Sequence, residues 1–492
     1  NTPGGPLYSA TAVTYAGYAE GVLAESHQGR PTKLEGNPDH PASLGATGAI
    51  TQAQVLTLYD PDRAKEVTQK GQPSTWADFA SALSATLAGL PGGDGFALLT
   101  ENVTSPTLAS QITDFLGQYP QARWFQYDPV HPDNTVAGAR LAFGQDATPV
   151  YDFRAADVVV ALDSDFMDSG PGSLAHARAF ADARRRRPAT PPMNRLYAFE
   201  TSPTHAASLA DHRVALKPSD VAALAAALAA AVGASAPAAQ RPSAVSQALF
   251  DALVADLQAN RGKSLVVVGQ DQPPVVHAIG HALNAALGNV GATVSYLQPA
   301  AARPAVHREE LAKLVGLMNG GSLKALVIVD ANPVYTAPAS LDFAGALAKV
   351  PFSARLGLYD DETAAAVSWS LPASHFLEAW GDARAFDGTV TIRQPLILPF
   401  YAGKSDIELL GALLGKPDTA GYDVVRAYWR ANVTGSFDDF WRESVYRGTV
   451  AGSRSQAVNV SAAPVTEALP TAANIELKLV LDDSLLDGRF AN

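Results

Sequence analysis

The sequence predicts an α/β protein built from several doubly wound domains, with a small β-rich region at its N-terminus. Short apolar runs, such as residues 95–100 and 325–329, alternate along the chain with helical segments. Such runs are typical of parallel strands buried on both faces, and their spacing is that of right-handed βαβ units. A length of 492 residues is too great for one simple core and favours two to four domains.

The composition bounds the class of protein. Hydrophobic residues make up 47% of the chain and charged residues 17%, which is typical of a well-buried globular protein and not of a disordered one. The net charge, 36 − 48 = −12, argues against a nucleic-acid partner, which requires a basic face. The chain has no Cys and therefore no disulfide, thiolate nucleophile or cysteine-bound metal. No apolar run reaches the roughly 20 residues that span a bilayer.

Residues 28–63 form the most informative stretch. We expect a short strand at 32–35, which Gly and Pro at 36–38 end, because Gly tolerates positive φ and Pro has no N–H donor. A strand from within 13–23 is expected to pair with it. A helix of one or two turns is expected at 51–58, stopped by the Pro that follows.

The rest of the chain alternates strands and helices. The expected strands are 95–100, 122–127, 156–162, 195–200, 214–216, 264–269, 325–329, 355–359 and 367–371. The expected helices are 76–87, 105–117, 173–185, 219–232, 246–258, 274–287, 308–316, 341–348, 405–414, 422–430 and 437–446. Ser219 is expected to cap its helix, since a hydroxyl can accept from a first-turn N–H group.

Four other segments are expected to be less regular. Residues 1–17 are expected to form an extended arm, 234–242 a linker and 381–390 a turn-rich hairpin. Residues 474–481 alternate apolar and polar side chains, which predicts a half-exposed strand. No later segment offers that strand a partner.

The stretch 28–63 resembles the N-terminal part of the molybdopterin oxidoreductases, the family of dimethyl sulfoxide reductase. In that family a GRPvkveGNPdHPvs run precedes a Cys and then an LYdPdR segment; this chain has GRPTKLEGNPDHPAS and LYDPDR. By this resemblance, two of the four cysteines that hold a [4Fe–4S] cluster fall at about Glu20 and Gly48. Neither is Cys, so the resemblance implies the frame of a cluster domain without a cluster.

The resemblance covers nearly the whole chain. Further matching segments are 156–160, 201–217, 325–333, 361–372 and 376–381. After the first of these, the family has a Gly-Ser-Asn that approaches a pterin nucleotide closely. Here Ala161, Leu162 and Asp163 would crowd the nucleotide, and Asp163 and Asp165 would repel its phosphates.

One branch is most similar. The pattern SHxGRPxKxEGNPxHPASLGAT, the DSDF at 163–166 and the segment 394–415 resemble the large iron–sulfur subunit of alternative complex III, a bacterial membrane complex that oxidises quinol. In that subunit the molybdopterin-like half is thought to hold no pterin, and a ferredoxin-like half carries the clusters. Residues 487–492 resemble the junction before that second half.

The resemblance implies four regions. They are a degenerate cluster-domain-like region at 1–70, a discontinuous α/β domain at 71–140 and 290–420, a second α/β domain at 141–289, and a C-terminal connecting segment at 421–492. The implied function is that of a non-catalytic, cofactor-free half that supports electron transfer from quinol to a periplasmic acceptor.

The implied neighbours are a ferredoxin-like iron–sulfur half, a multihaem cytochrome c subunit and integral membrane quinol-binding subunits, on the periplasmic face of a bacterial cytoplasmic membrane. Two other interpretations stay open. A pterin-dependent molybdenum oxidoreductase that lost only its N-terminal cluster would release guanine nucleotide on heating. A free binding protein with a vestigial cleft would be a monomer without co-purifying subunits.

Individual side chains offer few metal or catalytic candidates, and we assign no catalytic, cofactor-binding or metal-ligating residue. His277 and His281 are spaced i, i+4 on a helix, but zinc sites need three or four ligands. Asp163, Asp165 and Asp168 could bind calcium through oxygen, although no EF-hand loop is present.

Two further features have ordinary structural interpretations. His40 lies in the loop that would flank a cluster, and we expect it to make a loop hydrogen bond. The basic run 184–187 is expected to interact with a helix C-terminus and solvent, with docking on an acidic partner as the alternative.

Overall fold

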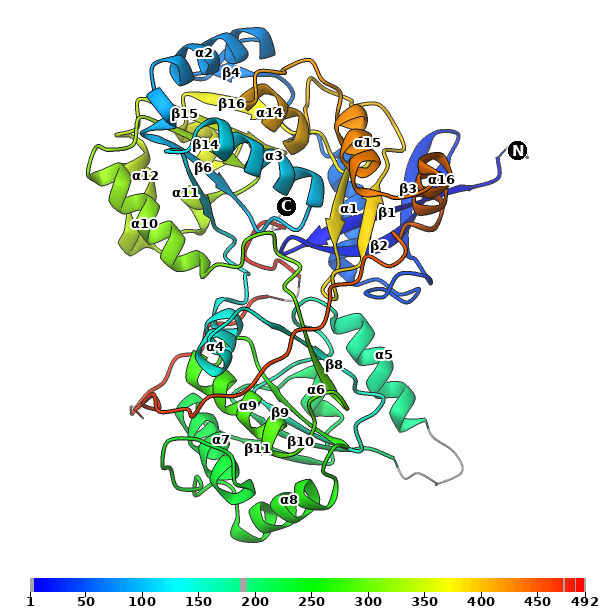
Figure 1. Cartoon of the computed structure of the whole chain (residues 1–492), viewed down its shortest axis with the longest axis vertical. Coiled ribbons are helices and arrows are strands. Elements are labelled where there is room, and N and C mark those ends of the chain that lie inside the picture. The colour runs from blue at the N-terminus through cyan, green and yellow to red at the C-terminus, as the bar shows by residue number, and fades with distance from the viewer. Residues whose placement is uncertain (1–3, 186–192, 472–473, 483, 491–492) are drawn as a thin grey trace.

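The computed structural model describes residues 4–185, 193–471, 474–482 and 484–490. Its elements form three units (Figure 1). The N-terminal unit is built on a three-stranded antiparallel sheet, the second unit on a seven-stranded sheet and the third on a four-stranded sheet. The first two lie in the upper half of Figure 1 and the third lies below them.

The N-terminal unit is a meander followed by a helix: β1 (Leu7–Tyr15), β2 (Tyr18–His27), β3 (Arg30–Gly36) and α1 (Ala49–Tyr59). Ala16 and Gly17 join the first two strands and have φ of 49° and 80°, as a tight two-residue hairpin turn requires. The pairing of β2 with β3 confirms the expected strand pair. The expected extended arm is wrong for residues 7–15, because the hairpin turn pairs them with β2.

The second unit has helices on both faces of its sheet. The strand order is β5-β4-β16-β15-β14-β6-β7, and the last five strands are parallel. The strands are β4 (Thr68–Gln69), β5 (Gln72–Pro73), β6 (Phe96–Thr100), β7 (Arg123–Gln126), β14 (Ala325–Val329), β15 (Phe352–Gly357) and β16 (Trp369–Pro372). One core lies under α2 (Trp76–Ala88), α3 (Pro106–Gln118) and α14 (Asp406–Leu413), and another under α10 (His307–Asn319) and α12 (Phe343–Leu347).

The third unit is also covered on both faces. Its four parallel strands have the order β11-β10-β9-β12, with bounds β9 (Val158–Leu162), β10 (Arg195–Glu200), β11 (His212–Ala215) and β12 (Ser264–Val268). One face packs against α7 (Pro218–Val232), α8 (Gln247–Ala259) and α9 (Pro274–Ala286), the other against α5 (Ser173–Arg184). Two doubly wound sheets beside a β-rich N-terminal region confirm the predicted fold class.

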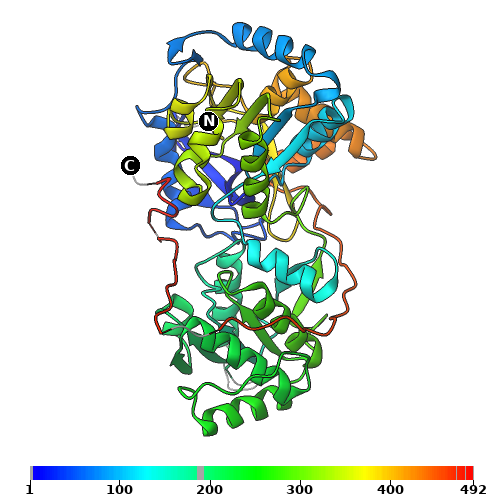
Figure 2. The same cartoon turned by 90° about the vertical axis from the view of Figure 1, so that its left-hand side faces the viewer.

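The remaining elements connect and close these units. They are α4 (Asp133–Phe143), β8 (Thr148–Tyr151), α6 (His205–Ser208), β13 (Val294–Leu297), α11 (Pro333–Thr336), α13 (Glu362–Ala366), β17 (Gly381–Arg384), β18 (Val390–Arg393), α15 (Gly421–Asn432) and α16 (Phe437–Arg447), with short 3-10 turns at Pro91–Gly93 and Ala339–Leu341. Figure 2 shows the chain after α16 passing down one side of the third unit, crossing it and returning to the upper units.

Two sequence expectations are corrected by local structure. Ser219 is not the cap of α7: the helix begins one residue earlier at Pro218, and the N-cap is Lys217, whose side chain makes no capping bond. Ser219 instead donates its backbone N–H and hydroxyl to Glu476 (2.9 and 2.6 Å).

The second correction concerns residues 474–481, which form no strand. The predicted alternation is nevertheless present: Ile475, Leu477 and Leu479 are exposed by 89%, 83% and 79%. The intervening Glu476 and Lys478 bond to the third unit. The side chains of Glu476 and Lys478 therefore hold this segment in place, and not the backbone hydrogen bonds of a strand.

A candidate cofactor cleft

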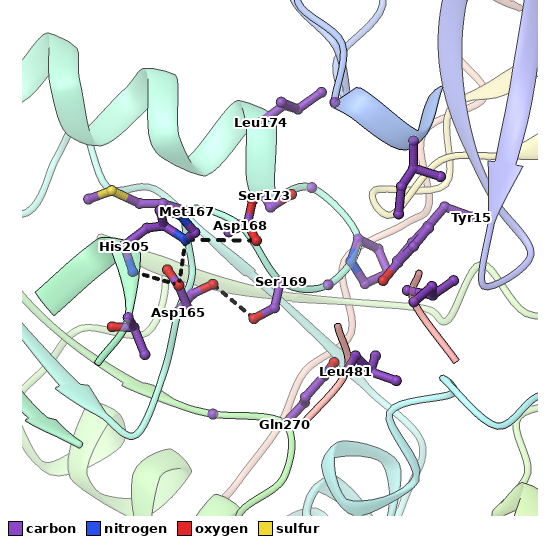
Figure 3. Close-up of a pocket in the computed structure, with 18 of the residues that line it drawn as sticks. Tyr15, Asp165, Met167, Asp168, Ser169, Ser173, Leu174, His205, Gln270 and Leu481 are labelled. Carbon is purple, nitrogen blue, oxygen red and sulfur yellow. Dashed lines mark hydrogen bonds and ion pairs between the residues drawn. The ribbon is translucent and has the colours of Figure 1, made fainter. Parts of the chain in front are cut away.

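A cleft of about 850 Å³ lies where the N-terminal unit faces the third unit. One wall contains Tyr15, Tyr18, Glu20 and the start of α1. The opposite wall includes the loops that follow β9, β10 and β12, and Figure 3 shows Tyr15 facing the side that carries Asp165, Ser169 and His205. In open α/β sheets, ligands bind at the carboxyl ends of the parallel strands. The cleft is at such an edge.

Asp163 is the first residue after β9, and its backbone has a positive φ of 54°. Its carboxylate accepts hydrogen bonds from the backbone N–H of Thr201 (2.9 Å) and from Nε2 of Gln272 (2.9 Å). Nζ of Lys478 lies 2.9 Å from Oδ2. Burial disfavours ionisation, but the Lys478 and Thr201 donors outweigh it and hold the pKa of Asp163 below its ordinary value. The chain's own donors therefore already bind this carboxylate.

The neighbouring Asp165 is bound in the same way. Its oxygens accept the backbone N–H groups of His205 (2.8 Å) and Ala206 (3.1 Å) at the start of α6, and Nδ1 of His205 lies 3.2 Å away. Figure 3 shows His205 between Asp165 and Asp168. Among the described residues, no three His, Asp or Glu side chains converge as a metal site. Donors of the chain itself are bonded to Asp163 and Asp165, an arrangement that does not favour the calcium alternative for Asp163, Asp165 and Asp168.

Glu20 and Gly48, the two positions expected to replace cluster cysteines, come together at the edge of the cleft. Gly48 is the N-cap of α1, and its backbone hydrogen-bonds to the Glu20 carboxyl, as does the Thr51 side chain. Burial outweighs both bonds and raises the pKa of Glu20 to about 7. Oε1 of Glu20 is buried and has no hydrogen-bond partner among the described residues. A carboxyl group thus occupies the place expected for a thiolate.

His40 confirms the expectation of a loop hydrogen bond. Its Nδ1 accepts the backbone N–H groups of Gly21 and Ala42, both at 3.2 Å. The Ser43 hydroxyl donates to the Gly21 carbonyl at 2.7 Å, which closes the same loop. Burial lowers the pKa of His40 to about 4, so the ring is neutral and can accept. A side-chain acceptor holds this loop.

His277 and His281 lie in the interior of the third unit. Both are buried in α9, and burial lowers their pKa values to about 4 and about 3. Nδ1 of His281 is 2.9 Å from the Tyr296 hydroxyl. A Cβ at Gly138 would lie 2.3 Å from Cβ of His277, so α4 and α9 cross in close contact here. These histidines pack the interior of the third unit.

The basic run is described only in part, since Arg186 and Arg187 lie outside the described residues. Arg185 is the C-cap of α5, as the helix-end interpretation expects. Arg184 makes a two-pronged ion pair with Asp211, with an Nη2–Oδ2 distance of 2.8 Å.

Segments that are far apart in the sequence, and that each resemble the same family, are joined by side-chain hydrogen bonds. Arg63, from the LYDPDR segment, donates twice to Glu378, at 3.1 and 2.6 Å, with side chains only 1% and 0% exposed. Asn332, from the ANP turn, accepts from the backbone and hydroxyl of Thr363 at 3.2 and 2.6 Å. These residues hold the architecture and do not line the cleft.

The comparisons with known proteins agree with this architecture. No protein-family model matches the sequence. Acetylene hydratase from Pelobacter acetylenicus is similar in structure, with a TM-score of 0.62 and 11% identity over 91% of this chain and 74% of that one. The fold is that of the molybdopterin oxidoreductases.

A sequence relative supports the same superfamily. It is the menaquinone reductase, molybdopterin-binding-like subunit of Nitratidesulfovibrio vulgaris, 26% identical over 464 residues. The match covers 85% of this chain and 66% of the relative, so the chain spans slightly less than two thirds of the relative's length. Among the described residues, no helix combines the length and hydropathy needed to cross a bilayer.

The residues present do not fit the cofactors that this fold family implies. A [4Fe–4S] cluster requires thiolate ligands, and the chain offers a carboxyl at Glu20 and a glycine at Gly48. A pterin dinucleotide carries phosphates, which favour cations and free N–H donors. The cleft presents Asp163, Asp165 and Asp271 instead, and its lysine, Lys478, is bonded to Asp163. The described residues of the cleft thus lack the thiolate ligands that a cluster requires and the free cation that a phosphate favours.

The sequence reasoning missed the participation of Glu20 and Lys478. Glu20 was noted only as a missing cysteine. Lys478 belongs to the alternating segment 474–481, and its alternation was the one available signal that polar side chains there share a common face. Neither partner of Lys478, Asp163 or Asp271, is near it in sequence.

Proposed function

We propose that this chain is a non-catalytic subunit, or half of one, in a membrane complex that exchanges electrons with a quinone. Its work is to hold redox-active neighbours in register. The observation that carries the proposal is the cleft itself. It lies at the carboxyl end of β9, yet Glu20 stands where a cluster thiolate is expected, and Lys478 of the chain's own C-terminal segment binds Asp163.

The relative's name supports the quinone assignment. That protein is a menaquinone reductase subunit described as molybdopterin-binding-like, and the match extends along 85% of this chain. The proposal extends its assembly in a complex to this chain. The finer proposal rests on the resemblance to alternative complex III: quinol as donor, a periplasmic acceptor, and a peripheral position on the outer face of the cytoplasmic membrane. The neighbours would be a ferredoxin-like iron–sulfur half, a multihaem cytochrome c and integral quinol-binding subunits.

The experiment is a tagged purification from native membranes in mild detergent, followed by mass spectrometry of co-purifying subunits. Elemental analysis for molybdenum, tungsten and iron is then made on this chain after separation from its partners. We expect haem-bearing and membrane subunits to co-purify and metals to be far below one equivalent in the separated chain. Stoichiometric molybdenum, tungsten or iron would contradict the non-catalytic role. A monomer without partners would contradict the complex.

A second candidate is a pterin-dependent molybdenum oxidoreductase that lacks the N-terminal cluster. The cleft volume of about 850 Å³ at a sheet edge is the observation that favours it. Heating the purified chain and analysing the supernatant separates the two candidates. Guanine nucleotide at one or two equivalents supports the second candidate, and its absence supports the first.

A further inference from the structure

The C-terminal segment, residues 474–482 and 484–490, carries two cations to the carboxyl-end edges of two different sheets. Lys478 reaches the loops after β9 and β12 in the third unit. Arg489 reaches the loops after β6 and β7 in the second unit. Figure 2 shows this part of the chain rising from the lower unit to the upper ones. Both edges are the places where ligands of open α/β sheets bind.

On the third unit, a lysine and a glutamate of the segment both bond to the protein. Nζ of Lys478 lies 2.9 Å from Asp163 and 4.0 Å from Asp271. Two residues earlier, the Glu476 carboxylate accepts from the backbone N–H and hydroxyl of Ser219, in the first turn of α7. A helix N-terminus favours a carboxylate because its first N–H groups have no partner within the helix. The alternate residues Ile475 and Leu477 point away and are exposed.

At the second unit, Arg489 joins several carboxylates. Its guanidinium lies 3.3 Å from Glu101, 3.2 Å from Asp128 and 2.9 Å from Asp487. Burial raises the pKa of Glu101, against the attraction of Arg489. Burial likewise raises the pKa of the nearby Asp330 to about 6. Arg489 therefore offsets a concentration of acidic groups at the carboxyl ends of β6, β7 and β14.

Between its two cations the segment contacts the N-terminal unit. Leu481, Leu486 and Phe490 pack in one apolar cluster with the hairpin turn of β1 and β2 and the start of α1 (Tyr15, Ala16, Tyr18 and Ile50) and with Val130. The segment thus touches all three units, and it lines the cleft through Lys478, Val480 and Leu481.

We propose that the C-terminal segment is an internal ligand of the cleft: a peptide whose two cations, Lys478 and Arg489, occupy the carboxyl-end sites of two sheets and tie the units together. The inference rests on the proposed function, in which the cleft holds no cofactor. The physical reason is charge: Lys478 is attracted to Asp163 and Asp271 on the third unit and Arg489 to Glu101 and Asp128 on the second, so both units hold the same peptide.

The test uses the full chain, and the absence of Cys allows specific spin labelling. One label pair, at Ala248→Cys on α8 and Ala312→Cys on α10, reports the distance between the second and third units; both sites are exposed. A second pair, at Leu477→Cys and Ala248→Cys, reports whether the segment stays on the third unit. Distances are measured by pulsed electron spin resonance with and without Lys478→Met and Arg489→Met together.

We expect the double substitution to broaden both distance distributions and to shift the inter-unit distances to longer values. The matched control is Arg442→Met, which removes an exposed ion pair with Asp439 and should change neither. An unchanged inter-unit distribution overturns the proposal, whether or not the segment itself is released. The result is independent of metal and nucleotide analysis, so failure of this inference is distinguishable from failure of the proposed function.

Discussion

The two sides of the N-terminal unit differ in how their buried carboxyl groups, Glu378 and Glu20, are bonded. On the side that meets the second unit, the guanidinium of Arg63 and the carboxylate of Glu378 form a two-pronged ion pair, and Glu378 also accepts from the backbone N–H groups of His375 and Phe400 (both 2.9 Å). On the side that meets the cleft, Glu20 retains a buried oxygen without a partner.

The difference between Glu378 and Glu20 lies in how each buried carboxyl group is stabilised. Burying a charge is favourable only with a close partner and further hydrogen bonds, and Glu378 has both. Glu20 has weaker support, and burial shifts its pKa upward as a result. The Glu378 carboxylate therefore has an opposite charge and further donors, whereas the Glu20 carboxyl, at a position expected for a cluster ligand, is buried with weaker hydrogen-bond support.

The largest expected effect comes from breaking the ion pair between Arg63 and Glu378. Arg63→Met leaves the Glu378 carboxylate buried without its cation, and we expect a loss of about 3–5 kcal/mol in the free energy of unfolding. Equilibrium denaturation with urea measures it. The paired variant Arg63→Met with Glu378→Met removes both charges and should recover most of that loss. A double variant as unstable as the single one would show that packing, not charge pairing, dominates here.

His40 gives the next effect. His40→Ala removes the acceptor of two buried backbone N–H groups, those of Gly21 and Ala42, and each unsatisfied donor costs about 1–3 kcal/mol. We expect a total loss of roughly 2–4 kcal/mol in the free energy of unfolding. The matched control is His27→Ala at the end of β2, where the side chain is 42% exposed, and it should cost under about 0.5 kcal/mol. Equal losses for the two variants would contradict the assigned role of His40.

Much of this framework could be predicted from sequence. Buried strands have a strong local signal, and 325–329 was located to the residue. The helix α4 was missed because Gly138 lowers helix propensity in its middle. The structure shows why that glycine is there: a Cβ would collide with His277 on α9. A tertiary contact, invisible in the local pattern, therefore decides this element.

The cleft was less predictable. The absence of cysteine at Glu20 and Gly48 could be read from the resemblance, but the raised pKa of Glu20 depends on burial by distant segments. Arg489 binds Glu101 and Asp128, which are far from it in sequence. Short elements such as β8 and β13 form a two-stranded sheet with each other, and they carried no periodic signal of their own. Non-local pairing accounts for these failures.

A smaller effect concerns the pH dependence of the interior. His281 is buried, and burial lowers its pKa from 6.5 to about 3. As pH falls below 6.5, the unfolded chain gains a proton that the folded chain does not, so the free energy of unfolding falls by up to about 1.4 kcal/mol per pH unit for such a residue. His281→Phe should reduce the slope between pH 6 and 4 by about one proton.

Denaturation at a series of pH values measures this slope. The substitution also removes the bond to the Tyr296 hydroxyl, and that loss is independent of pH in this range. The comparison is therefore made between slopes and not between absolute stabilities. An unchanged slope would mean that His281 titrates normally in the folded chain.

The smallest effect concerns Glu20, and its dependence on pH has the opposite sign to that of His281. The pKa of Glu20 is raised by burial from 4.5 to about 7. Below pH 4.5 the group is protonated in both folded and unfolded chains. As pH rises from 4.5 to 7, the unfolded chain releases the proton first, so stability is lost across this window and is constant above it.

Glu20→Gln removes this titration while keeping the shape of the side chain. We expect the variant to lack the loss between pH 4.5 and 7 and to be more stable than the parent at pH 8 by roughly 1–2 kcal/mol. This is less than the roughly 3 kcal/mol that corresponds to the pKa shift, because the neutral amide of Gln is a weaker acceptor from Thr51 and Gly48 than the carboxylate. Glu443→Gln, on the exposed face of α16, is the control and should leave the profile unchanged. A Glu20→Gln variant that is less stable than the parent at pH 8 would show that the ionised carboxylate of Glu20 is stabilised where it stands and that burial does not raise its pKa.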